Sequence, residues 1–331
     1  INKGKFLTIW HKIKLYISFL IMYENLDIIT IGESLIEFST DRPLSFADTF
    51  TKFYWGDTLA VAVSALRSGS KEGYITKVKN DGFGEYLLDA WQMEGLDSGQ
   101  VKFADFQNGI YFTGQKNNKV EMQFYRKKTA ASTLCIDDID FDYIKSAKFI
   151  FATGFVQSLS LSCRETVREV FKFARKNGIH VGYYPNFRHT ELSRDEAVEM
   201  FEEVKDYISI IFINTKDDLI FETESPDNLI TKLADSQLEN ALIIKNGVGI
   251  WSLDRTESSY IDMIQFEPKD LTGYTSAIIG AYISSRLKGD SRIDSLRYAN
   301  VLGSIQASIT GAIRSIPKWE TVMELLGKYY G

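Results

Sequence analysis

The stretch Asp270-Leu271-Thr272-Gly273-Tyr274-Thr275-Ser276-Ala277 says more about fold and function than any other part of this 331-residue sequence. Its Asp-Leu-Thr-Gly turn runs into the apolar segment Ala277 to Ile283, which predicts a helix. A turn that opens a helix leaves backbone N–H groups free at the positive end of the helix dipole. Phosphate oxygens bind readily at such a place, so the stretch indicates a phosphate site.

The sequence from residue 27 onward alternates short apolar runs with segments of helical periodicity. This alternation is typical of an α/β fold in which helices cover both faces of a mostly parallel sheet. The runs that predict buried strands are Asp27–Gly32, Lys148–Ala152, Ile179–Tyr184, Ile208–Ile213 and Ala241–Lys245. Asp57 to Arg67 predicts a helix that ends before Gly69. Ser162–Glu165 and Ser193–Glu196 both fit the capping box that opens a helix.

Two segments interrupt this alternation, because each contains strands with no helix between them. Residues 35–54 and residues 109–126 predict exposed strands, and the second segment forms a hairpin around residues 116–119. Such strands form a small sheet that stands off the main one and can cover a cleft as a lid. The sequence has five prolines, no internal repeat and no evident linker, so we expect residues 22–331 to form one domain with a β lid.

The composition argues against several classes of function. A net charge of -6 disfavours nonspecific nucleic-acid binding, which needs a basic face. Two cysteines without a CxxC pair and three histidines exclude a disulfide framework and disfavour a thiolate or imidazole metal site. A glycine-rich Walker loop and a dinucleotide fingerprint are also absent. The cysteine usage fits the reducing cytoplasm.

The first 22 residues carry four lysines and a short apolar run, Leu15 to Ile21. That run is too short to span a bilayer, and no small-residue cleavage site follows it as in a signal peptide. Met22 stands just before the first strand, so we expect it to be the natural start and residues 1–21 to be an extension or disordered segment outside the fold. The alternative is an amphipathic helix on a membrane surface.

Several separated motifs make the sequence similar to the ribokinase-like (PfkB) carbohydrate kinases, and they follow the order of that family. They are Ile31–Glu37, Gly56–Ala62, Phe124–Ser132, Tyr184–Arg188, Ile244–Gly249 and Asp270–Ala277. The last resembles the family signature Asp-Thr-Thr-Gly-Ala-Gly-Asp-Ala, and the set looks most like that of the 2-keto-3-deoxygluconate kinases. The resemblance covers residues 26–325.

This resemblance implies a ribokinase-like three-layer αβα sandwich with a mostly parallel central sheet of eight or nine strands and a small β lid. It implies a homodimer that forms through the lid. It further implies a transferase that uses ATP and Mg²⁺ to phosphorylate a hydroxyl of a small sugar acid, with no nucleic-acid or membrane partner.

The resemblance also assigns roles to individual residues. On the substrate side these are Gly56, Asp57, Tyr111, Tyr125, Arg126 and Arg188. The two arginines suit a carboxylate, because a guanidinium fork binds it with two parallel hydrogen bonds. On the nucleotide side they are Asn214, Lys245, Gly247, Gly249, Thr272 and Asn300. Asp217 is expected to hold Mg²⁺ through water, and the catalytic motif contributes Asp270, Gly273 and Ser276, which occupies the position of the family's general base.

Each of these roles has a plainer alternative. The arginines are alternatively solvated surface charges, and the two tyrosines are alternatively packing or dimer contacts. Asn214 and Asp217 are alternatively a helix cap and a favourable acid in a first turn. The segment Lys245 to Gly249 also makes sense as a strand and turn that bind no ligand.

Several departures from the family pattern fall at polar positions of the site. They are Trp55 and Ala60 in the substrate loop, Tyr184 in place of an Asp, and Tyr274, Thr275 and Ser276 in the catalytic motif. A serine cannot take up a proton as a carboxylate does, and general-base catalysis contributes ~10²–10⁴-fold. We expect side chains at 274 and 275 to obstruct the anion hole, at a further cost of ~10²–10³-fold.

Asp270 lies six residues before Ser276 and is one possible replacement base, although the family already uses an Asp there for another role. The sequence therefore predicts a kinase homologue with an impaired site, a pseudokinase candidate. The alternative is a non-catalytic sensor or partner subunit that binds a sugar or a nucleotide.

Overall fold

The computed structural model describes residues 25–117, 119–215, 217 and 238–331. The predictions for residues 1–21 and for Met22 therefore lie outside the described residues. Within the described part of the chain, no helix has both the length and the apolar character needed to cross a membrane.

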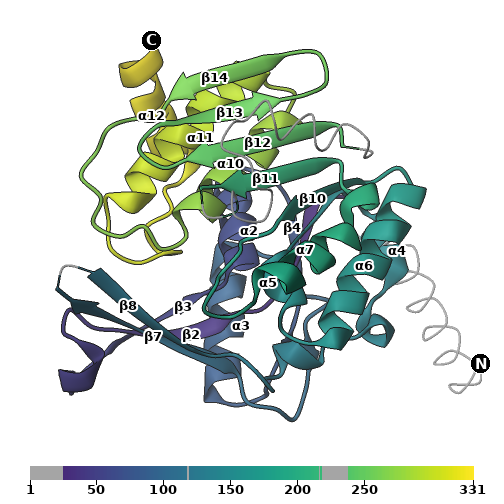
Figure 1. Ribbon diagram of the computed structural model, residues 1–331, viewed down its shortest axis with the longest axis vertical. Helices are drawn as coiled ribbons and strands as arrows, with labels where there is room; N and C mark the ends of the chain where they lie inside the picture. The colour runs from purple at the N-terminus through teal and green to yellow at the C-terminus, as the bar shows by residue number, and fades with distance from the viewer. Residues whose placement is uncertain (1–24, 118, 216, 218–237) are drawn as a thin grey trace, which may run out of the picture.

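The core of the molecule is an eight-stranded sheet with the strand order β14-β13-β12-β11-β10-β9-β1-β4 (Figure 1). Six neighbouring strands, from β12 to β4, run parallel, and β13 and β14 extend the sheet as an antiparallel edge. In chain order the strands are β1 (Leu26–Ile31), β4 (Glu72–Ile75), β9 (Ala147–Thr153), β10 (His180–Tyr184), β11 (Ile210–Asn214), β12 (Asn240–Lys245), β13 (Gly249–Leu253) and β14 (Ser258–Asp262).

Helices cover both faces of this sheet, which is why its strands are apolar runs rather than alternating sequences. Along β9, Phe149 and Phe151 pack into one core, while Ile150 and Ala152 pack into the other. The first core also contains residues of α2 (Asp57–Arg67), α3 (Gly82–Glu94), α10 (Tyr274–Leu287), α11 (Arg292–Ala307) and α12 (Trp319–Tyr330). The second contains residues of α4 (Phe141–Lys145), α5 (Gly154–Gln157), α6 (Leu161–Lys176) and α7 (Arg194–Glu202). The fold is thus the predicted three-layer sandwich.

A second, four-stranded sheet projects from the sandwich at the lower left of Figure 1. Its order is β3-β2-β7-β8, and its strands are β2 (Leu35–Ser39), β3 (Thr51–Trp55), β7 (Gly109–Lys116) and β8 (Lys119–Tyr125). The expectation that these strands are exposed is wrong at their ends near the sandwich, because Leu35, Ile36 and Tyr111 are fully buried and belong to the first core. The short elements are β5 (Lys77–Val78), β6 (Lys102–Phe103), η1 (Leu44–Phe46), η2 (Ala131–Thr133), η3 (Ile136–Asp138) and η4 (Lys205–Tyr207).

Local sequence signals located most helix starts, with two corrections. The capping box Ser193–Glu196 opens α7 as predicted, with both reciprocal hydrogen bonds present. The one predicted at Ser162 is wrong, because Ser160 caps α6 by accepting a hydrogen bond from the Cys163 backbone. The helix expected from Ala277 begins earlier, at Tyr274.

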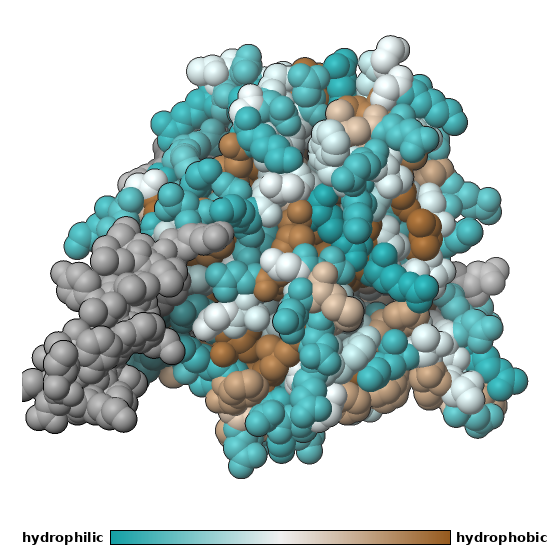
Figure 2. Space-filling model, turned by 180° about the vertical axis from the view of Figure 1, so that it is seen from behind, coloured by the Kyte–Doolittle hydropathy of each residue, from teal (hydrophilic) through white to brown (hydrophobic). Residues whose placement is uncertain are grey.

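The face opposite that of Figure 1 is covered mainly by hydrophilic side chains (Figure 2). Hydrophobic side chains also lie on this face, as on most folded protein surfaces.

Candidate active site

The substrate loop ends where β3 passes into α2, and its two central residues are tightly constrained. Gly56 is the N-cap residue of α2, and a Cβ there would lie 2.2 Å from the carbonyl oxygen of Glu33, so only glycine fits. The carboxylate of Asp57 is fully buried and accepts hydrogen bonds from the Thr153 hydroxyl at 2.7 Å and the Asn186 amide at 2.8 Å. Asp57 therefore joins the ends of β9 and β10 to the start of α2.

Arg188 lies in a cage of aromatic rings beside this carboxylate. Its guanidinium carbon lies 4.4 Å from the ring centre of Phe155, 5.1 Å from that of Trp55 and 5.2 Å from that of Phe124. Burial lowers the pKa of Arg188, while the nearby Asp57 acts in the opposite direction. No described residue forms an ion pair or hydrogen bond with this guanidinium, which leaves its donors for an anion.

Arg126, by contrast, is fully engaged by the protein. It is only 3% exposed, which excludes the surface-charge alternative. Its Nε donates a hydrogen bond to Glu33 Oε1 at 2.6 Å. Its other two nitrogens donate to the Phe155 carbonyl at 2.6 Å and to the Ser158 hydroxyl at 3.0 Å. The guanidinium also stacks on the ring of Phe155. Such a guanidinium is better placed to hold the site together than to bind a ligand.

Glu33 is a site residue to which the sequence analysis gave no role. Its carboxylate is completely buried, and burial raises its pKa to about 7 even though Arg126 favours the charged form. Its second oxygen, Oε2, has no hydrogen-bond partner among the described residues. The signal that could have found it is an acid in an apolar strand end, Ile31-Gly32-Glu33, where a charge needs a partner.

The catalytic motif forms the N-terminus of α10. Gly273 is the N-cap residue with φ 79°, a left-handed conformation that favours glycine, and it offers no side-chain cap. The backbone N–H groups of Thr275 and Ser276 have no acceptor among the described residues. The first turn of α10 therefore has backbone donors available for an anion.

The ring of Tyr274 points away from that place, while the obstruction expected from the Cβ atoms of residues 274 and 275 stays a prediction. The ring is buried, packs against Phe266 with ring centres 5.9 Å apart, and approaches Gly303 of α11. The side chain therefore points into the core between α10 and α11.

The acids and hydroxyls of the motif offer no evident base. Ser276 is 4% exposed at the base position. Asp270 Oδ1 accepts the Thr272 backbone N–H at 2.9 Å, and Oδ2 accepts that of Gly311 at 3.0 Å. Asp270 thus ties its own turn to the loop after α11, and both of its oxygens are in use.

The residues on the expected nucleotide side already make internal hydrogen bonds. Asp217 is fully buried, and its two oxygens accept the backbone N–H groups of Phe187 at 2.8 Å and Asn214 at 3.0 Å. The Asn214 amide donates to the hydroxyl of Tyr184. The residues that a helix capped by Asn214 would need lie outside the described part of the chain, so the capping alternative stays a prediction.

Asn300 is likewise fully buried. Its amide nitrogen donates to the Asp262 carbonyl at 2.9 Å and to the Tyr330 hydroxyl at 2.8 Å, so it ties α11 to β14 and α12. Lys245, Gly247 and Gly249 form the hairpin between β12 and β13, with φ 76° at Gly247. In the described part of the chain, no group of three His, Cys, Asp or Glu side chains is arranged to hold a metal ion.

The two lid tyrosines differ from each other. Tyr111 is fully buried, stacks on Phe124 with ring centres 5.3 Å apart and lies against Trp55, so its ring is part of the cage wall. Tyr125 is half exposed and lines a neighbouring pocket.

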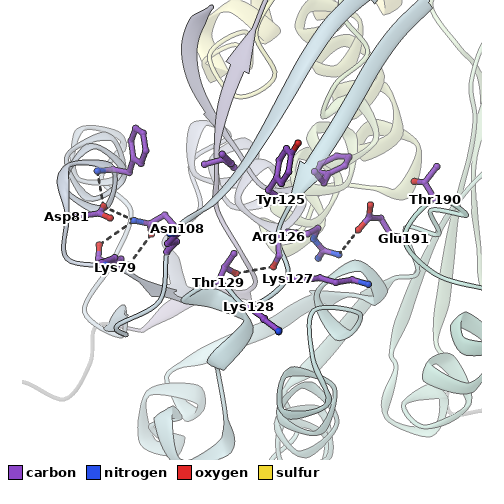
Figure 3. A pocket seen from close by; sticks show the side chains of 14 residues that line it. Lys79, Asp81, Asn108, Tyr125, Arg126, Lys127, Lys128, Thr129, Thr190 and Glu191 are labelled. Atoms are coloured by element: carbon purple, nitrogen blue, oxygen red, sulfur yellow. Dashed lines mark hydrogen bonds and ion pairs between the residues drawn. The ribbon is translucent and has the colours of Figure 1, made fainter. Parts of the chain in front are cut away.

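That pocket, of about 830 Å³, lies beneath strands β7 and β8. Its lining residues are Lys79, Asp81, Phe83, Gln107, Asn108, Ile110, Phe124, Tyr125, Arg126, Lys127, Lys128, Thr129, Thr190 and Glu191. Figure 3 shows Lys79, Asp81 and Asn108 at one end and Arg126, Glu191 and Thr190 at the other. The pocket shares Phe124 with the cage and is also lined by Arg126, but it includes no residue of the segment 270–277.

Comparison with known proteins gives consistent relatives. A family model described as pfkB family carbohydrate kinase matches residues 25–319. The chain is 26% identical over 319 residues to a 5-dehydro-2-deoxygluconokinase of Clostridium beijerinckii, covering 91% of this chain and 93% of that one. It is 28% identical over 322 residues to the probable fructokinase-6, chloroplastic, of Arabidopsis thaliana, covering 91% and 82%.

Two solved structures share the fold. A putative ribokinase II of E. coli in complex with ATP and Mg²⁺ superposes with a TM-score of 0.86 at 19% identity, covering 92% of this chain and 100% of that one. A 2-dehydro-3-deoxygluconokinase of Thermotoga maritima superposes with a TM-score of 0.82 at 18% identity, covering 91% and 99%.

Proposed function

The chain belongs to the pfkB family of carbohydrate kinases, and from this premise we propose that it binds a sugar acid together with ATP but transfers the phosphoryl group slowly. The ligand is a compound like 2-keto-3-deoxygluconate, and the ancestral reaction is phosphorylation of one of its hydroxyls. One observation supports the proposal. The start of α10 has backbone N–H donors available for a phosphate, but the only carboxylate of its motif, that of Asp270, already accepts two backbone hydrogen bonds.

The acidic character of the ligand follows from Arg188. The guanidinium of Arg188 is partly exposed within its aromatic cage and has no ion pair or hydrogen bond among the described residues, so it can bind a group that is itself charged and planar, which describes a carboxylate. The neighbouring pocket adds Lys79, Lys127 and Lys128 to the surroundings, against Asp81 and Glu191. Two kinds of relative make this choice testable, since deoxygluconates carry a carboxylate and fructose carries none.

The residues at α10 fit a phosphate group, because free backbone N–H groups at a helix N-terminus are its usual donors. Bound Mg²⁺ would neutralise phosphate charge, and we propose that Asp217 acts on it through water. Direct coordination fits poorly, because both oxygens of this fully buried carboxylate already accept backbone hydrogen bonds. Gly273 permits close approach, while Thr272, Lys245, Gly247, Gly249 and Asn300 would shape the nucleotide site.

The slow turnover follows from Ser276 and Asp270. A serine hydroxyl cannot accept the proton of the attacking sugar hydroxyl at neutral pH, and Asp270 is held by two backbone groups. Loss of the base alone costs ~10²–10⁴-fold. The same two observations favour the alternative function, in which the chain binds its sugar acid or nucleotide as a sensor or partner subunit without turnover.

We also propose that the chain forms a homodimer through its lid, in the cytoplasm where ATP is available. On β8 the hydrophobic side chains of Val120, Met122 and Tyr125 are exposed, and β3 and β8 are open sheet edges. Both features favour association with a second lid.

Two measurements test the proposal. Calorimetric titration with 2-keto-3-deoxygluconate, 5-dehydro-2-deoxygluconate and fructose is expected to show binding of an acid and none of fructose. A coupled ADP assay with Mg²⁺ and ATP is expected to give a turnover below ~0.1 s⁻¹, since kinases commonly reach ~1–100 s⁻¹ and the base is missing. Turnover above ~1 s⁻¹ would refute the impaired site, and binding of fructose alone would refute the acidic ligand.

A further inference from the structure

We propose that Trp55 is a ligand-binding residue: its indole N–H donates a hydrogen bond to an oxyanion held at the N-terminus of α10. The anion is a phosphate group, either free or carried by a nucleotide. The inference rests on the anion site of the proposed function but does not depend on turnover.

The indole of Trp55 is buried but its donor is unused. The residue is 3% exposed at the end of β3, and its Nε1 has no hydrogen-bond partner among the described residues. An indole N–H donates and cannot accept, and leaving such a buried donor unpaired costs free energy. An acceptor absent from the chain itself would remove that cost.

The unused donor lies beside the N-terminus of α10. Nε1 lies 3.5 Å from the position that a Cβ on Gly273 would take, and Gly273 is the N-cap residue of this helix. Around it, the backbone N–H groups of Thr275 and Ser276 also lack acceptors among the described residues. Donors from two distant parts of the chain thus converge where the helix dipole favours negative charge.

The position of the indole is fixed by its neighbours. Its ring contacts Tyr111 and Phe155, with ring centres 5.6 Å and 6.3 Å apart, and the unpaired guanidinium of Arg188 lies over it. A donor held by packing loses little entropy when it binds, which favours a functional hydrogen bond. A nearby positive charge without a partner makes an anion the natural acceptor.

This role explains why the large residue is tolerated where the family resemblance has a glycine. The ring of Trp55 adds aromatic surface to the cage, and its N–H group supplies a polar contact to the phosphate. A phenylalanine would keep the ring packing and remove only the N–H group, so Trp55→Phe isolates the hydrogen bond.

Titration followed by NMR of the indole N–H groups tests the proposal on the full chain. The Trp55 signal is identified by its absence in Trp55→Phe, and inorganic phosphate and, separately, a non-hydrolysable ATP analogue with Mg²⁺ are added to the wild type. We expect the Trp55 indole proton to shift with at least one of the two, and the ligand that shifts it identifies the source of the phosphate. In calorimetry we expect Trp55→Phe to bind that ligand about tenfold more weakly, as for a hydrogen bond to a charged group.

Trp251, which lies on β13 against Tyr260, supplies the matched control: Trp251→Phe should bind as the wild type does. Phosphate binding without a shift of the Trp55 signal would overturn this inference and leave the anion site intact. Absence of binding by either ligand to the wild type would overturn the anion site itself. If Trp55→Phe folds poorly, the Trp55 signal is assigned from its through-space contacts with the rings of Tyr111 and Phe155, and the wild-type titration then decides the matter.

Discussion

Glu33 and Arg126 form a buried ion pair between residues 93 positions apart in the chain, with Arg126 Nε 2.6 Å from Glu33 Oε1. The pair joins the end of β1 to the segment that leaves the lid after β8, and its guanidinium also reaches the turn of α5. It lies directly beside the cage that holds Arg188, since both arginines stack on Phe155. The lid and the sandwich are therefore coupled at the site.

Breaking this pair should destabilise the protein strongly. Arg126→Gln leaves Glu33 without its counter-ion and forces the buried acid to take up a proton, and Glu33→Gln leaves the buried Arg126 with only Glu191, 4.0 Å away, as a carboxylate neighbour, so each should cost ~3–5 kcal/mol of unfolding free energy. The double substitution should cost clearly less than the sum of the two, because no lone charge remains. Urea unfolding measures all three variants, and additive costs would show that the pair is not coupled.

Arg188 should determine affinity for acids and leave the binding of neutral ligands unaffected. Arg188→Gln keeps a polar side chain but removes the charge, so affinity for the sugar acid should fall at least ~10-fold, as expected for a charge-assisted hydrogen bond. Calorimetric titration checks this, with exposed Arg194→Gln as the matched control that should bind normally. Equal affinities of wild type and Arg188→Gln for the acid would show that Arg188 does not bind the ligand.

Glu72 should make the protein less stable as the pH rises. This residue of β4 is 2% exposed, neither of its oxygens has a hydrogen-bond partner among the described residues, and burial raises its pKa well above the ordinary value of 4.5. The folded state therefore binds a proton that the unfolded state releases near pH 4.5, and stability falls as the pH rises from there toward the raised pKa.

Glu72→Gln removes this penalty, so thermal unfolding should occur at a higher temperature than in the wild type at pH 8 and at a similar temperature at pH 4.5. Exposed Glu165→Gln is the control and should change neither value. A higher unfolding temperature for the wild type than for Glu72→Gln at pH 8 would mean that the Glu72 carboxylate is charged and stabilised in the folded state.

The fold could be predicted from sequence because its signals are local. Apolar runs such as Lys148 to Ala152 predict strands buried on both faces, and Ser193 with Glu196 predicts a helix start from four adjacent residues. The same locality explains the error at α6, where Ser160 and Ser162 both suit an N-cap and only the path of the chain selects Ser160.

The site could be predicted only in part, because its interactions join distant segments. The sequence identified Ser276 and Trp55 as departures, but the direction of a side chain depends on what it packs against. The ring of Tyr274 turns into the core toward Phe266. Asp270 accepts a hydrogen bond from Gly311, 41 residues later, and no local pattern predicts that contact. The pairing of Glu33 with Arg126 also joins distant segments, so no local sequence pattern predicts it.

The most direct test of the impaired site is to restore the base. Ser276→Asp places a carboxylate at the first turn of α10, and Ser276→Asn places a group of the same shape that cannot take up a proton. The turnover number of each is measured with Mg²⁺, ATP and saturating 2-keto-3-deoxygluconate. The account predicts that Ser276→Asp exceeds both wild type and Ser276→Asn by ~10²-fold or more. A wild-type turnover equal to that of Ser276→Asp would contradict it and would mean that this chain already has a working base.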